Sequence, residues 1–457
     1  MKVLREAIQR DRDYSIGLLR ELIRIPTLMP GGTVEDQARS LDLCRQALDG
    51  LGFRLEAWIS RTGNHQMVAT YEPARMSAPG IVLNCHLDVV PAGSLADWHH
   101  DPFGAEMEGD RIYGRGACDM KGGVVAVLAA MRALLGRGYE PRGRIVLQLV
   151  TDEEYGDIGT KECVARGHVA DVSLVAEPTN LKMVTSEAGI EQFRVEVHGL
   201  ATHSSARRQY VHAGGGLRAA NAIEKAVKVI LAFQELEREW AVHKNHPLLP
   251  PGSNTINPGI IRGGPGGGKD GQLLAPSHPG TTADYCALEY DVCYLPSETQ
   301  AEIRGELGGY LDRICQADPW LSEHPPRVTW GIHGLSAPPA VMPLDHPFIR
   351  DAREAFKDLG WQFAPAAVNW TSDLPWLAQG GAPGVVFGPG GAEFAHGPDE
   401  FITADDTLQA ALLIAVLVGR WTQAGSHLSQ GGQVGCATST GSLPRPRSST
   451  AKVRARG

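Results

Sequence analysis

The chain has 457 residues, which is more than one ordinary hydrophobic core accommodates, so two domains are expected. With 43% hydrophobic and 21% charged residues, the composition is that of a soluble globular protein. The net charge of −9 at pH 7 argues against a nucleic acid or an anionic membrane as the partner of the folded part.

The sequence predicts no targeting or membrane-spanning segment. Residues 1–26 alternate charged and apolar residues and lack the continuous apolar core of a signal peptide. The most apolar stretch, 408–418, is too short to cross a bilayer. Residues 425–457 contain five Lys or Arg, no Asp or Glu, and many Ser, Gly and Pro, so we expect a disordered basic tail. Eight cysteines without a CxxC pair predict reduced thiols and a cytoplasmic location.

The first part of the chain, residues 1–186, alternates helical and strand patterns, which predicts an α/β domain with a mostly parallel sheet. Continuous apolar runs bounded by turn residues predict its strands, and periodic apolar residues predict its helices. The predicted helices cover 3–24, 34–51, 124–135 and a short segment near Lys161, and the predicted strands cover 81–83, 145–150 and 172–175.

An inserted α+β domain is expected over residues 187–336, after which the α/β pattern resumes over 337–424. The insert is predicted to contain strands at 192–197, 255–261 and 287–294 and helices at 214–239 and 302–314. The resumed part is predicted to contain a helix at 347–359, a strand at 384–387 and a helix at 403–421. One discontinuous catalytic domain interrupted by an insert is the organisation that these patterns favour.

Two glycine-rich segments are poor candidates for nucleotide sites. The run Gly263–Asp270 resembles a phosphate-binding loop, but Asp270 stands where a hydroxyl should reach magnesium, and no good helix start follows. The pair Gly114 and Gly116 lacks the remainder of a dinucleotide fingerprint. A surface loop is the better interpretation of 263–270.

Histidines and carboxylates collect where predicted strands end or glycine-rich turns begin. Carboxylates are costly to bury, so such a group needs a cation or a shared proton. Imidazoles and carboxylates without a cysteine cluster are typical of a hard or borderline divalent metal. The residues are His86, Asp88, Asp119, Glu153, Glu154, Glu177 and His396.

Taken singly, each residue is weak evidence, since a lone histidine is more often packed or solvated and an acidic pair usually marks a surface turn. Together they match two neighbouring metals that share a carboxylate. On a strand, His86 and Asp88 would share a face, so Asp88 can orient the imidazole. Asp119 follows a tight glycine turn and suits a bridging position.

Counting ligands separates the two adjacent glutamates. If Asp119 bridges, each metal needs one terminal carboxylate and one imidazole, and Glu154, Glu177, His86 and His396 supply that number. Glu153 is then left over as a carboxylate beside the metals, which is what a general base requires. Both glutamates can serve one site only if the strand has ended by Asp152. Cys85 and Cys118 flank these residues and are weaker ligand candidates.

Six motifs in this order resemble the M20 metallopeptidases, a family that includes acetylornithine deacetylase, succinyl-diaminopimelate desuccinylase, aminoacylase and glutamate carboxypeptidase. The resemblance covers about residues 15–422. The motifs are HLDVVP, GRGACDMKGG, DEEYG, EPT, GLATHSS and AHGPDE.

The resemblance implies a zinc-exopeptidase-like catalytic domain with two Zn²⁺ ions per chain, which Co²⁺ can replace. His86, Asp119 and Glu177 would hold one ion. Asp119, Glu154 and His396 would hold the other. Glu153 would act as the general base on an amide bond, and Asp88 would orient the metal-binding residues.

The resemblance also implies that the insert is a lid that pairs two subunits into a homodimer. His203 in GLATHSS would reach the partner's active site and stabilise the oxyanion; without the resemblance, a surface histidine at a strand end would be favoured. Asn254 and Asn257 in NTINPG, and Gly390 in the loop 388–391, resemble substrate-contacting residues.

Several stretches resemble the acetylornithine deacetylase and succinyl-diaminopimelate desuccinylase branch, and especially a deformylase of an aminomethylpyrimidine in thiamin salvage. Many relatives carry an arginine in the lid strand where this chain has Cys293, which puts recognition of a substrate α-carboxylate in doubt unless Arg207, Arg208 or Arg262 replaces it.

The sequence therefore predicts a dinuclear zinc amidohydrolase that removes a small N-acyl group (acetyl, succinyl or formyl), similar to acetylornithine deacetylase. The alternatives are the formyl-aminopyrimidine deformylase, a dipeptidase or carboxypeptidase of the same fold, and an inactive metal-binding dimer. The last predicts loss of the base or of a ligand, whereas Glu153 and all five ligand positions are present.

Overall fold

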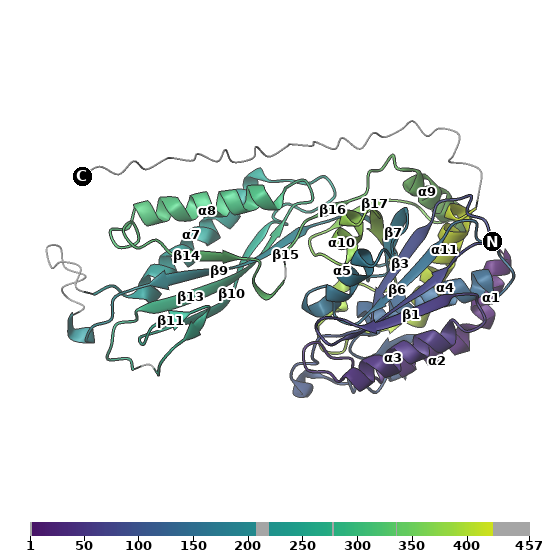
Figure 1. Ribbon diagram of the computed structural model, residues 1–457, viewed down its shortest axis with the longest axis horizontal. Helices are drawn as coiled ribbons and strands as arrows, with labels where there is room; N and C mark the ends of the chain where they lie inside the picture. The colour runs from purple at the N-terminus through teal and green to yellow at the C-terminus, as the bar shows by residue number, and fades with distance from the viewer. Residues whose placement is uncertain (1, 207–218, 277, 335, 424–457) are drawn as a thin grey trace, which may run out of the picture. The chain divides into compact units, whose positions relative to one another are not determined.

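The computed structural model of the protein describes residues 2–206, 219–276, 278–334 and 336–423 (Figure 1). Its larger sheet has nine strands, drawn from both ends of the chain. In sheet order, the path is β1-β2-β6-β3-β7-β18-β8-β16, with β17 paired to β8. Their bounds are β1 Arg54–Ile59, β2 His65–Tyr71, β3 Ile81–His86, β6 Ile145–Val150, β7 Val172–Val175, β8 Met183–Glu187, β16 Ala340–Val341, β17 Pro365–Val368 and β18 Gly384–Val386.

The central strands β6, β3, β7 and β18 pair in parallel, while β1, β2 and β16 add antiparallel pairs toward the edges. Every residue of β3 and β6 is buried, as expected for a parallel strand covered on both faces. Successive residues of β3 point into the hydrophobic cores on opposite faces of the sheet. Leu83 packs into the core on one face, and Val82 packs into the core on the other.

Helices cover both faces of this sheet (Figure 1). One face carries α1 Lys2–Arg10, α2 Arg12–Ile23, α3 Val34–Ala47, α4 Gly122–Leu135, α9 Pro347–Leu359 and α11 Ala404–Trp421. The other carries α5 Ile158–Ala165 and α10 Leu374–Gln379. A small sheet of β4 Met107–Glu108, β5 Arg111–Tyr113 and β19 Phe401–Thr403 completes this part.

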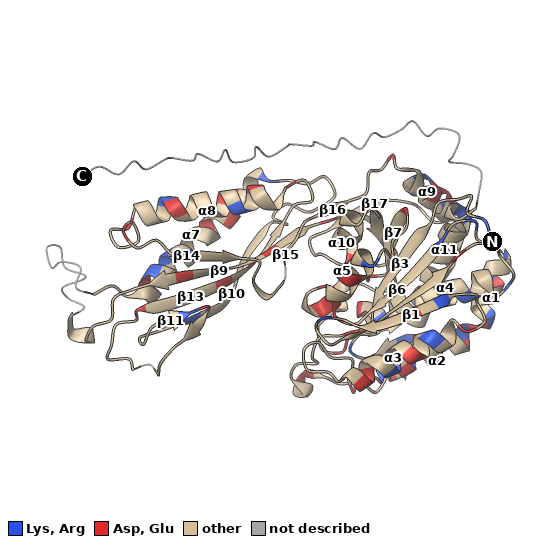
Figure 2. Cartoon of the chain, viewed as in Figure 1, with Lys and Arg blue, Asp and Glu red and all other residues tan. Residues whose placement is uncertain are grey.

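The second sheet has five strands in the order β10-β13-β9-β14, with β15 paired to β9. Their bounds are β9 Gly189–His198, β10 Thr255–Gly264, β13 Tyr285–Tyr294, β14 Arg327–Trp330 and β15 Ser336–Ala337, and a short hairpin joins β11 Gly268–Lys269 to β12 Gln272–Leu273. Helices α7 Ala222–His243 and α8 Gln300–Gln316 share a core with the strands, through residues such as Phe193, Phe233 and Leu307. Charged residues of both signs recur along α8 and α3 (Figure 2).

Three predicted helices differ clearly in extent from those observed. The helix predicted over 34–51 ends at Ala47. The helix predicted over 3–24 is interrupted at Asp11, which leaves helical geometry and starts a second helix at Arg12. The helix predicted from 214 begins at Ala222, because the side chain of Asn221 caps its first turn. Residues 214–218 and the predicted tail, 425–457, lie outside the described residues.

The predicted α/β class with an additional domain is confirmed. The chain passes from the nine-stranded to the five-stranded sheet between Glu187 and Gly189, and it returns between Ala337 and Ala340. The predicted boundaries, 186/187 and 336/337, fall within one or two residues of the adjoining strand ends.

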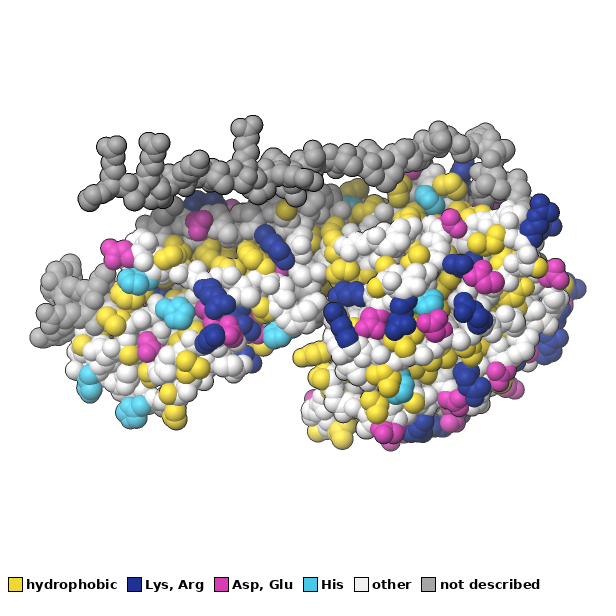
Figure 3. All heavy atoms as spheres, in the orientation of Figure 1, with side chains coloured by type: hydrophobic (Ala, Val, Ile, Leu, Met, Phe, Trp, Pro, Cys, Tyr) yellow, Lys and Arg dark blue, Asp and Glu magenta, His cyan; other side chains and the backbone are white. Residues whose placement is uncertain are grey.

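The mixture of side chains on the surface and the hydrophobicity of the helices are those expected from the composition. On the face seen in Figure 3, basic, acidic and apolar side chains are interspersed. Among the described residues, none of the helices combines the length and hydrophobicity needed to cross a membrane. The seven cysteines in the described part of the chain are all unpaired.

Candidate metal centre and active site

The predicted metal-binding residues meet at the carboxyl ends of the parallel strands, where ligands bind in open α/β sheets. His86 is the last residue of β3 and lies opposite Val150, the last residue of β6. Glu153 and Glu154 follow in the short helix η3 (Glu153–Tyr155), so the strand has ended before them, as their shared role requires. Asp119 lies in the turn η2 (Ala117–Lys121).

One triad of side chains gathers around His86. Its Nε2 lies 3.1 Å from Oδ1 of Asp119 and 3.3 Å from Oε1 of Glu177. Close packing makes this possible: a Cβ on Gly123, at the start of α4, would stand 1.9 Å from the carbonyl oxygen of Ala176. Only glycine at that position lets α4 approach the end of β7, so Asp119 and Glu177 come within reach of one imidazole.

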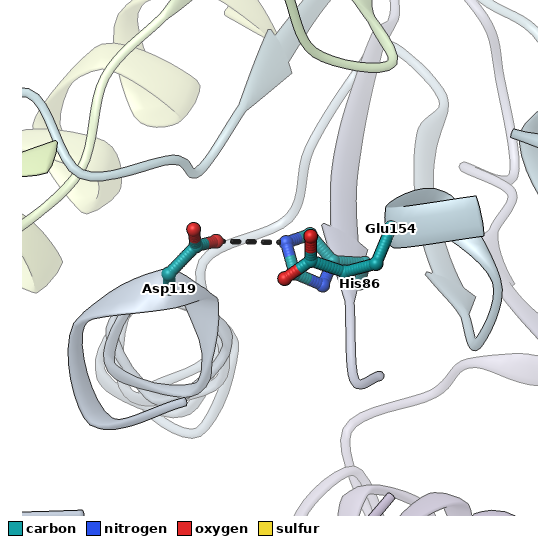
Figure 4. Close-up of side chains that lie close together, drawn as sticks. All are labelled: His86, Asp119 and Glu154. Carbon is teal, nitrogen blue, oxygen red and sulfur yellow. Dashed lines mark hydrogen bonds and ion pairs between the residues drawn. The ribbon is translucent and has the colours of Figure 1, made fainter. Parts of the chain in front are cut away.

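A second triad gathers around His396 and uses the other oxygen of the same aspartate. Nε2 of His396 lies 3.3 Å from Oδ2 of Asp119 and 3.2 Å from Oε2 of Glu154. Figure 4 shows His86, Asp119 and Glu154 pointing toward one another from β3, η2 and η3. Asp119 therefore offers one oxygen to each imidazole.

The electrostatics of the cluster favour a bound cation. Burial raises the pKa of Glu177 to about 7, and it also raises the pKa of Glu153. Hydrogen bonds to Asp119 and Glu154 raise the pKa of His396 to about 10. Burial opposes the ionisation of Asp119, but hydrogen bonds from both histidines lower its pKa overall. Four carboxylates thus face two imidazoles, which leaves negative charge to be offset.

The donor set fits divalent metal ions. His86, Asp119 and Glu154 each place a ligand atom within 4.8 Å of the others. Oε1 of Glu177 is buried, and the ring nitrogen nearest to it, Nε2 of His86 at 3.3 Å, lies closer to Asp119, at 3.1 Å. Imidazole nitrogens and carboxylate oxygens are ligands of Zn²⁺ and of other borderline divalent ions, and a metal would satisfy both carboxylates at once.

Asp88 lies beside the second ring nitrogen of His86, where the prediction puts it, and makes a further contact. Nδ1 of His86 lies 3.0 Å from the main-chain carbonyl oxygen of Asp88 and 3.6 Å from its carboxylate. That carboxylate also accepts hydrogen bonds from the amides of Glu153, at 3.3 Å, and Glu154, at 3.0 Å. Because β3 ends at His86, the alternation of a regular strand does not extend to Asp88. Asp88 thus holds the turn that presents both glutamates.

The two cysteines considered as ligands point elsewhere. Cys85 is buried in the core on the α4 side of the sheet, and Sγ of Cys118 lies 3.2 Å from the carbonyl oxygen of Gly391. Burial raises the pKa of both thiols, which disfavours the thiolates that bind metal.

A pocket of about 240 Å³ opens onto this cluster. Its lining combines predicted metal-binding residues and the predicted general base with one aromatic side chain, one hydroxyl side chain and three small apolar side chains. The lining residues are Asp119, Glu153, Glu154, Glu177, Pro178, Trp370, Thr371, Ala392, Ala395 and His396.

Residues 82–420 match the profile described as Peptidase family M20/M25/M40. The chain belongs to peptidase family M20/M25/M40. The predicted family and the predicted enzyme class, a metal-dependent hydrolase of amide bonds, are confirmed.

The chain is also similar over most of its length to two curated relatives. It is 32% identical to an N-formyl-4-amino-5-aminomethyl-2-methylpyrimidine deformylase of Halalkalibacterium halodurans, covering 91% of this chain and 96% of that protein. It is 28% identical to an acetylornithine deacetylase of Vibrio parahaemolyticus, covering 78% and 84%. A tripeptidase from Staphylococcus aureus has the same fold, with a TM-score of 0.68 at 18% identity, covering 90% of this chain and 99% of that one.

In this member of peptidase family M20/M25/M40, the predicted lid residues make the following contacts within the chain. His203 is exposed, and its Nδ1 lies 2.9 Å from Oγ of Ser205. Asn254 is buried and donates to Glu298, whereas Asn257 is an exposed residue of β10. In the catalytic domain, Gly390 packs beside Cys118, where an added Cβ would stand 3.1 Å from Sγ.

A buried ion pair that sequence reasoning missed connects the two metal-binding loops. Glu400 accepts the amides of Cys118 and Asp119 at 2.9 and 3.1 Å. Arg115 donates to Glu400 at 2.6 Å and to the carbonyl oxygen of His396 at 3.0 Å. His396 has φ +62°, a conformation that non-glycine residues adopt only when neighbours hold it. Arg115 and Glu400 lie inside two of the motifs that resemble the family, GRGACDMKGG and AHGPDE. Their place in these motifs was the signal by which the sequence could have indicated the pair.

Replacing Arg115 by leucine is expected to lower the free energy of unfolding by about 3–5 kcal/mol, because Glu400 would remain buried without its cation. Arg39→Leu is the control: it removes an exposed ion pair of 2.9 Å with Asp36, which is expected to cost less than about 1 kcal/mol. Urea unfolding of both variants measures the difference. Equal effects would mean that burial does not set the strength of the Arg115 pair.

The pocket wall formed by Trp370 and Thr371 is anchored by Glu187 at the end of β8. Its carboxyl group accepts Oγ of Ser372 at 2.9 Å and the Ser372 amide at 3.4 Å. Burial is the main cause that raises the pKa of Glu187 to about 8. The segment that carries Trp370 and Thr371 is therefore held by a carboxyl group, that of Glu187, which stays protonated at neutral pH.

The raised pKa of Glu187 makes the free energy of unfolding depend on pH in a defined direction. In the unfolded chain, a glutamate has a pKa of about 4.3, so between that value and about 8 unfolding releases a proton from Glu187. Its contribution to stability is full below this window and falls as pH rises through it. Glu187→Gln is expected to remove that dependence. The free energy of unfolding of the variant minus that of the wild type, measured by urea unfolding, should therefore be higher at pH 8 than at pH 5. The same difference at both pH values would contradict the raised pKa.

Proposed function

We propose that the chain is a dinuclear zinc amidohydrolase that removes the formyl group from a small aminomethylpyrimidine. The observation that carries this proposal is similarity over nearly the whole chain to a deformylase of that substrate, 32% identical over 91% of this chain. The similarity to an acetylornithine deacetylase is weaker and shorter, at 28% over 78%. The deformylase, an alternative from the sequence alone, thus becomes the preferred activity.

The missing lid arginine supports a substrate without an α-carboxylate. Cys293 pairs with Thr255 near one end of the β10–β13 ladder, whereas Arg262 pairs with Ala287 near the other. These positions are six residues apart along β13, or roughly 20 Å, so Arg262 does not replace an arginine at Cys293. Arg262 also lies 3.8 Å from Glu289. Arg207 and Arg208 lie outside the described residues.

The chain's own residues would divide the chemistry as follows. Ions held by the two triads supply Lewis acidity at the amide carbonyl and lower the pKa of water. Glu153 takes a proton from the attacking water and returns it to the leaving nitrogen, so that the formamide and water become formic acid and the free amine. Asp88 holds Glu153 in place through the Glu153 amide. Burial raises the pKa of Glu153, which brings it toward the range in which a carboxylate accepts and returns protons near neutral pH.

A substrate panel tests the proposal. The zinc-loaded full chain is assayed with N-formyl-4-amino-5-aminomethyl-2-methylpyrimidine, its N-acetyl and N-succinyl analogues, and N-acetylornithine. We expect kcat/KM to be at least about 100-fold higher for the formyl pyrimidine than for N-acetylornithine, since a site discriminates by differential binding of transition states. Preference for N-acetylornithine would overturn the deformylase assignment and restore the deacetylase.

We further propose that two chains pair through the lid and that His203 completes the partner's active site as an oxyanion donor. Mixing His203→Ala and Glu153→Ala subunits tests this. Each variant alone is inactive, but a mixed dimer has one site with both residues intact, so a random equimolar mixture should regain about one quarter of wild-type activity. No recovery after verified subunit exchange would contradict a role for His203 across the interface.

A further inference from the structure

Trp370 stands out among the side chains that line the pocket. The polar part of the lining consists of the carboxylates and His396, to which the proposed function assigns the chemistry on the amide. Among the described residues of the lining, Trp370 carries the one aromatic ring apart from that imidazole. The remaining side chains, Pro178, Thr371, Ala392 and Ala395, are small, so they leave the indole as the largest apolar surface available to a substrate.

The position of Trp370 is fixed by its neighbours. Two residues before it, the carbonyl oxygen of Val368 accepts the amide of Ala188 at 3.0 Å. The following residues, Thr371 and Ser372, donate to Glu187 at 3.3 and 2.9 Å. The indole is half-buried and packs against the core on the α10 side of the sheet. A ring held in this way binds a ligand without losing much conformational freedom.

The charge of the lining indicates which ligands the ring receives. Among the described residues that line the pocket, none is Lys or Arg, so this lining offers no guanidinium or ammonium group to a substrate carboxylate or phosphate. An uncharged planar group can lie flat on an indole and gain dispersion and stacking energy. Aromatic side chains bind pyrimidine and purine bases in this way irrespective of their hydrogen-bonding pattern.

We propose that Trp370 is a specificity-determining residue on which the heteroaromatic ring of the amine stacks while the N-acyl group faces the carboxylates. The identity of the ring as a pyrimidine rests on the proposed function. The stacking role itself rests on the pocket lining and on the anchored position of Trp370.

Trp370→Leu and Trp370→Phe test the role, with Trp361→Leu as the matched control, since Trp361 is also half-buried but does not line the pocket. For the formyl pyrimidine, Trp370→Leu should raise KM about tenfold to a hundredfold with little change in kcat, and Trp370→Phe should raise it less. For N-formylbutylamine, which has no ring, neither variant should change kcat/KM. Equal losses on both substrates, or no loss on the pyrimidine, would overturn the proposal.

Calorimetric binding of the free amine, 4-amino-5-aminomethyl-2-methylpyrimidine, to the zinc-loaded protein separates this inference from the proposed function. A wild type that binds the amine, with Kd raised at least about tenfold by Trp370→Leu and unchanged by Trp361→Leu, supports the stacking role even if the formyl pyrimidine is a poor substrate. An unchanged Kd in Trp370→Leu, or no binding by the wild type, would overturn it.

Discussion

Replacing Glu153 by glutamine is expected to lower kcat about 1,000-fold while both metal ions remain bound. Glu153 lines the pocket, yet the two histidine-centred triads are formed by Glu177, Glu154 and Asp119. Glutamine keeps the size of the side chain and the amide contact to Asp88, but it cannot accept a proton from water. The loss should therefore fall on catalysis and leave metal binding intact.

The neighbouring residue provides the control for this variant. Glu154→Gln has the same chemistry one position later, but Glu154 lies 3.2 Å from Nε2 of His396 and is predicted to bind metal. It should lose about one metal per chain, measured by inductively coupled plasma spectrometry, whereas Glu153→Gln should keep two. Full turnover in Glu153→Gln would mean that another group is the base. Metal loss in that variant would mean that Glu153 is a ligand.

Replacing Asp119 by alanine is expected to abolish binding of both ions and to reduce activity at least about 1,000-fold. One of its oxygens lies 3.1 Å from His86 and the other 3.3 Å from His396, so one substitution removes a ligand from each triad. Each remaining pair would hold an ion with only one imidazole and one carboxylate, which is fewer than the three protein ligands typical of a catalytic zinc site.

Metal content and thermal unfolding measure this effect together. Metal-loaded wild type should unfold at a higher temperature than the metal-free protein, because a ligand that binds only the folded state stabilises it. Asp119→Ala should lose that metal-dependent increase. Asp399→Ala is the control, since Asp399 is an acid three residues after His396 whose carboxylate contacts His99 instead of either triad. Retention of two ions by Asp119→Ala would contradict the bridging role.

The sequence predicted the centre of the fold because the central strands leave a clear pattern. Strands β3 and β6 are buried on both faces and read as continuous apolar runs, and the acidic and histidine side chains directly after them mark the ligand edge of the sheet. Strand β1 was not predicted, since it lies at the sheet edge with four of its six residues exposed and has no such run. The bounds of α9 were predicted to the residue, because Pro347 starts the helix and Gly360 ends it in the left-handed conformation.

The roles around the metals needed more than local pattern. His86, Glu153 and Glu154 follow from strand ends, but only the family resemblance assigned each residue to a particular ion. The Arg115–Glu400 pair joins residues 285 positions apart, and Glu187 reaches Ser372 across 185 positions. Such contacts have no periodic signal in a single sequence. The contact made by Asp88 depended on where β3 ends, which periodicity locates only to within a few residues.

The dinuclear centre itself is tested most directly by anomalous X-ray diffraction from crystals of the zinc-loaded protein, recorded on both sides of the zinc absorption edge. We predict two anomalous peaks about 3.5–4 Å apart, with Asp119 between them, one beside His86 and Glu177 and the other beside His396 and Glu154. A single peak in fully active protein, or a second peak away from His396 and Glu154, would contradict this account.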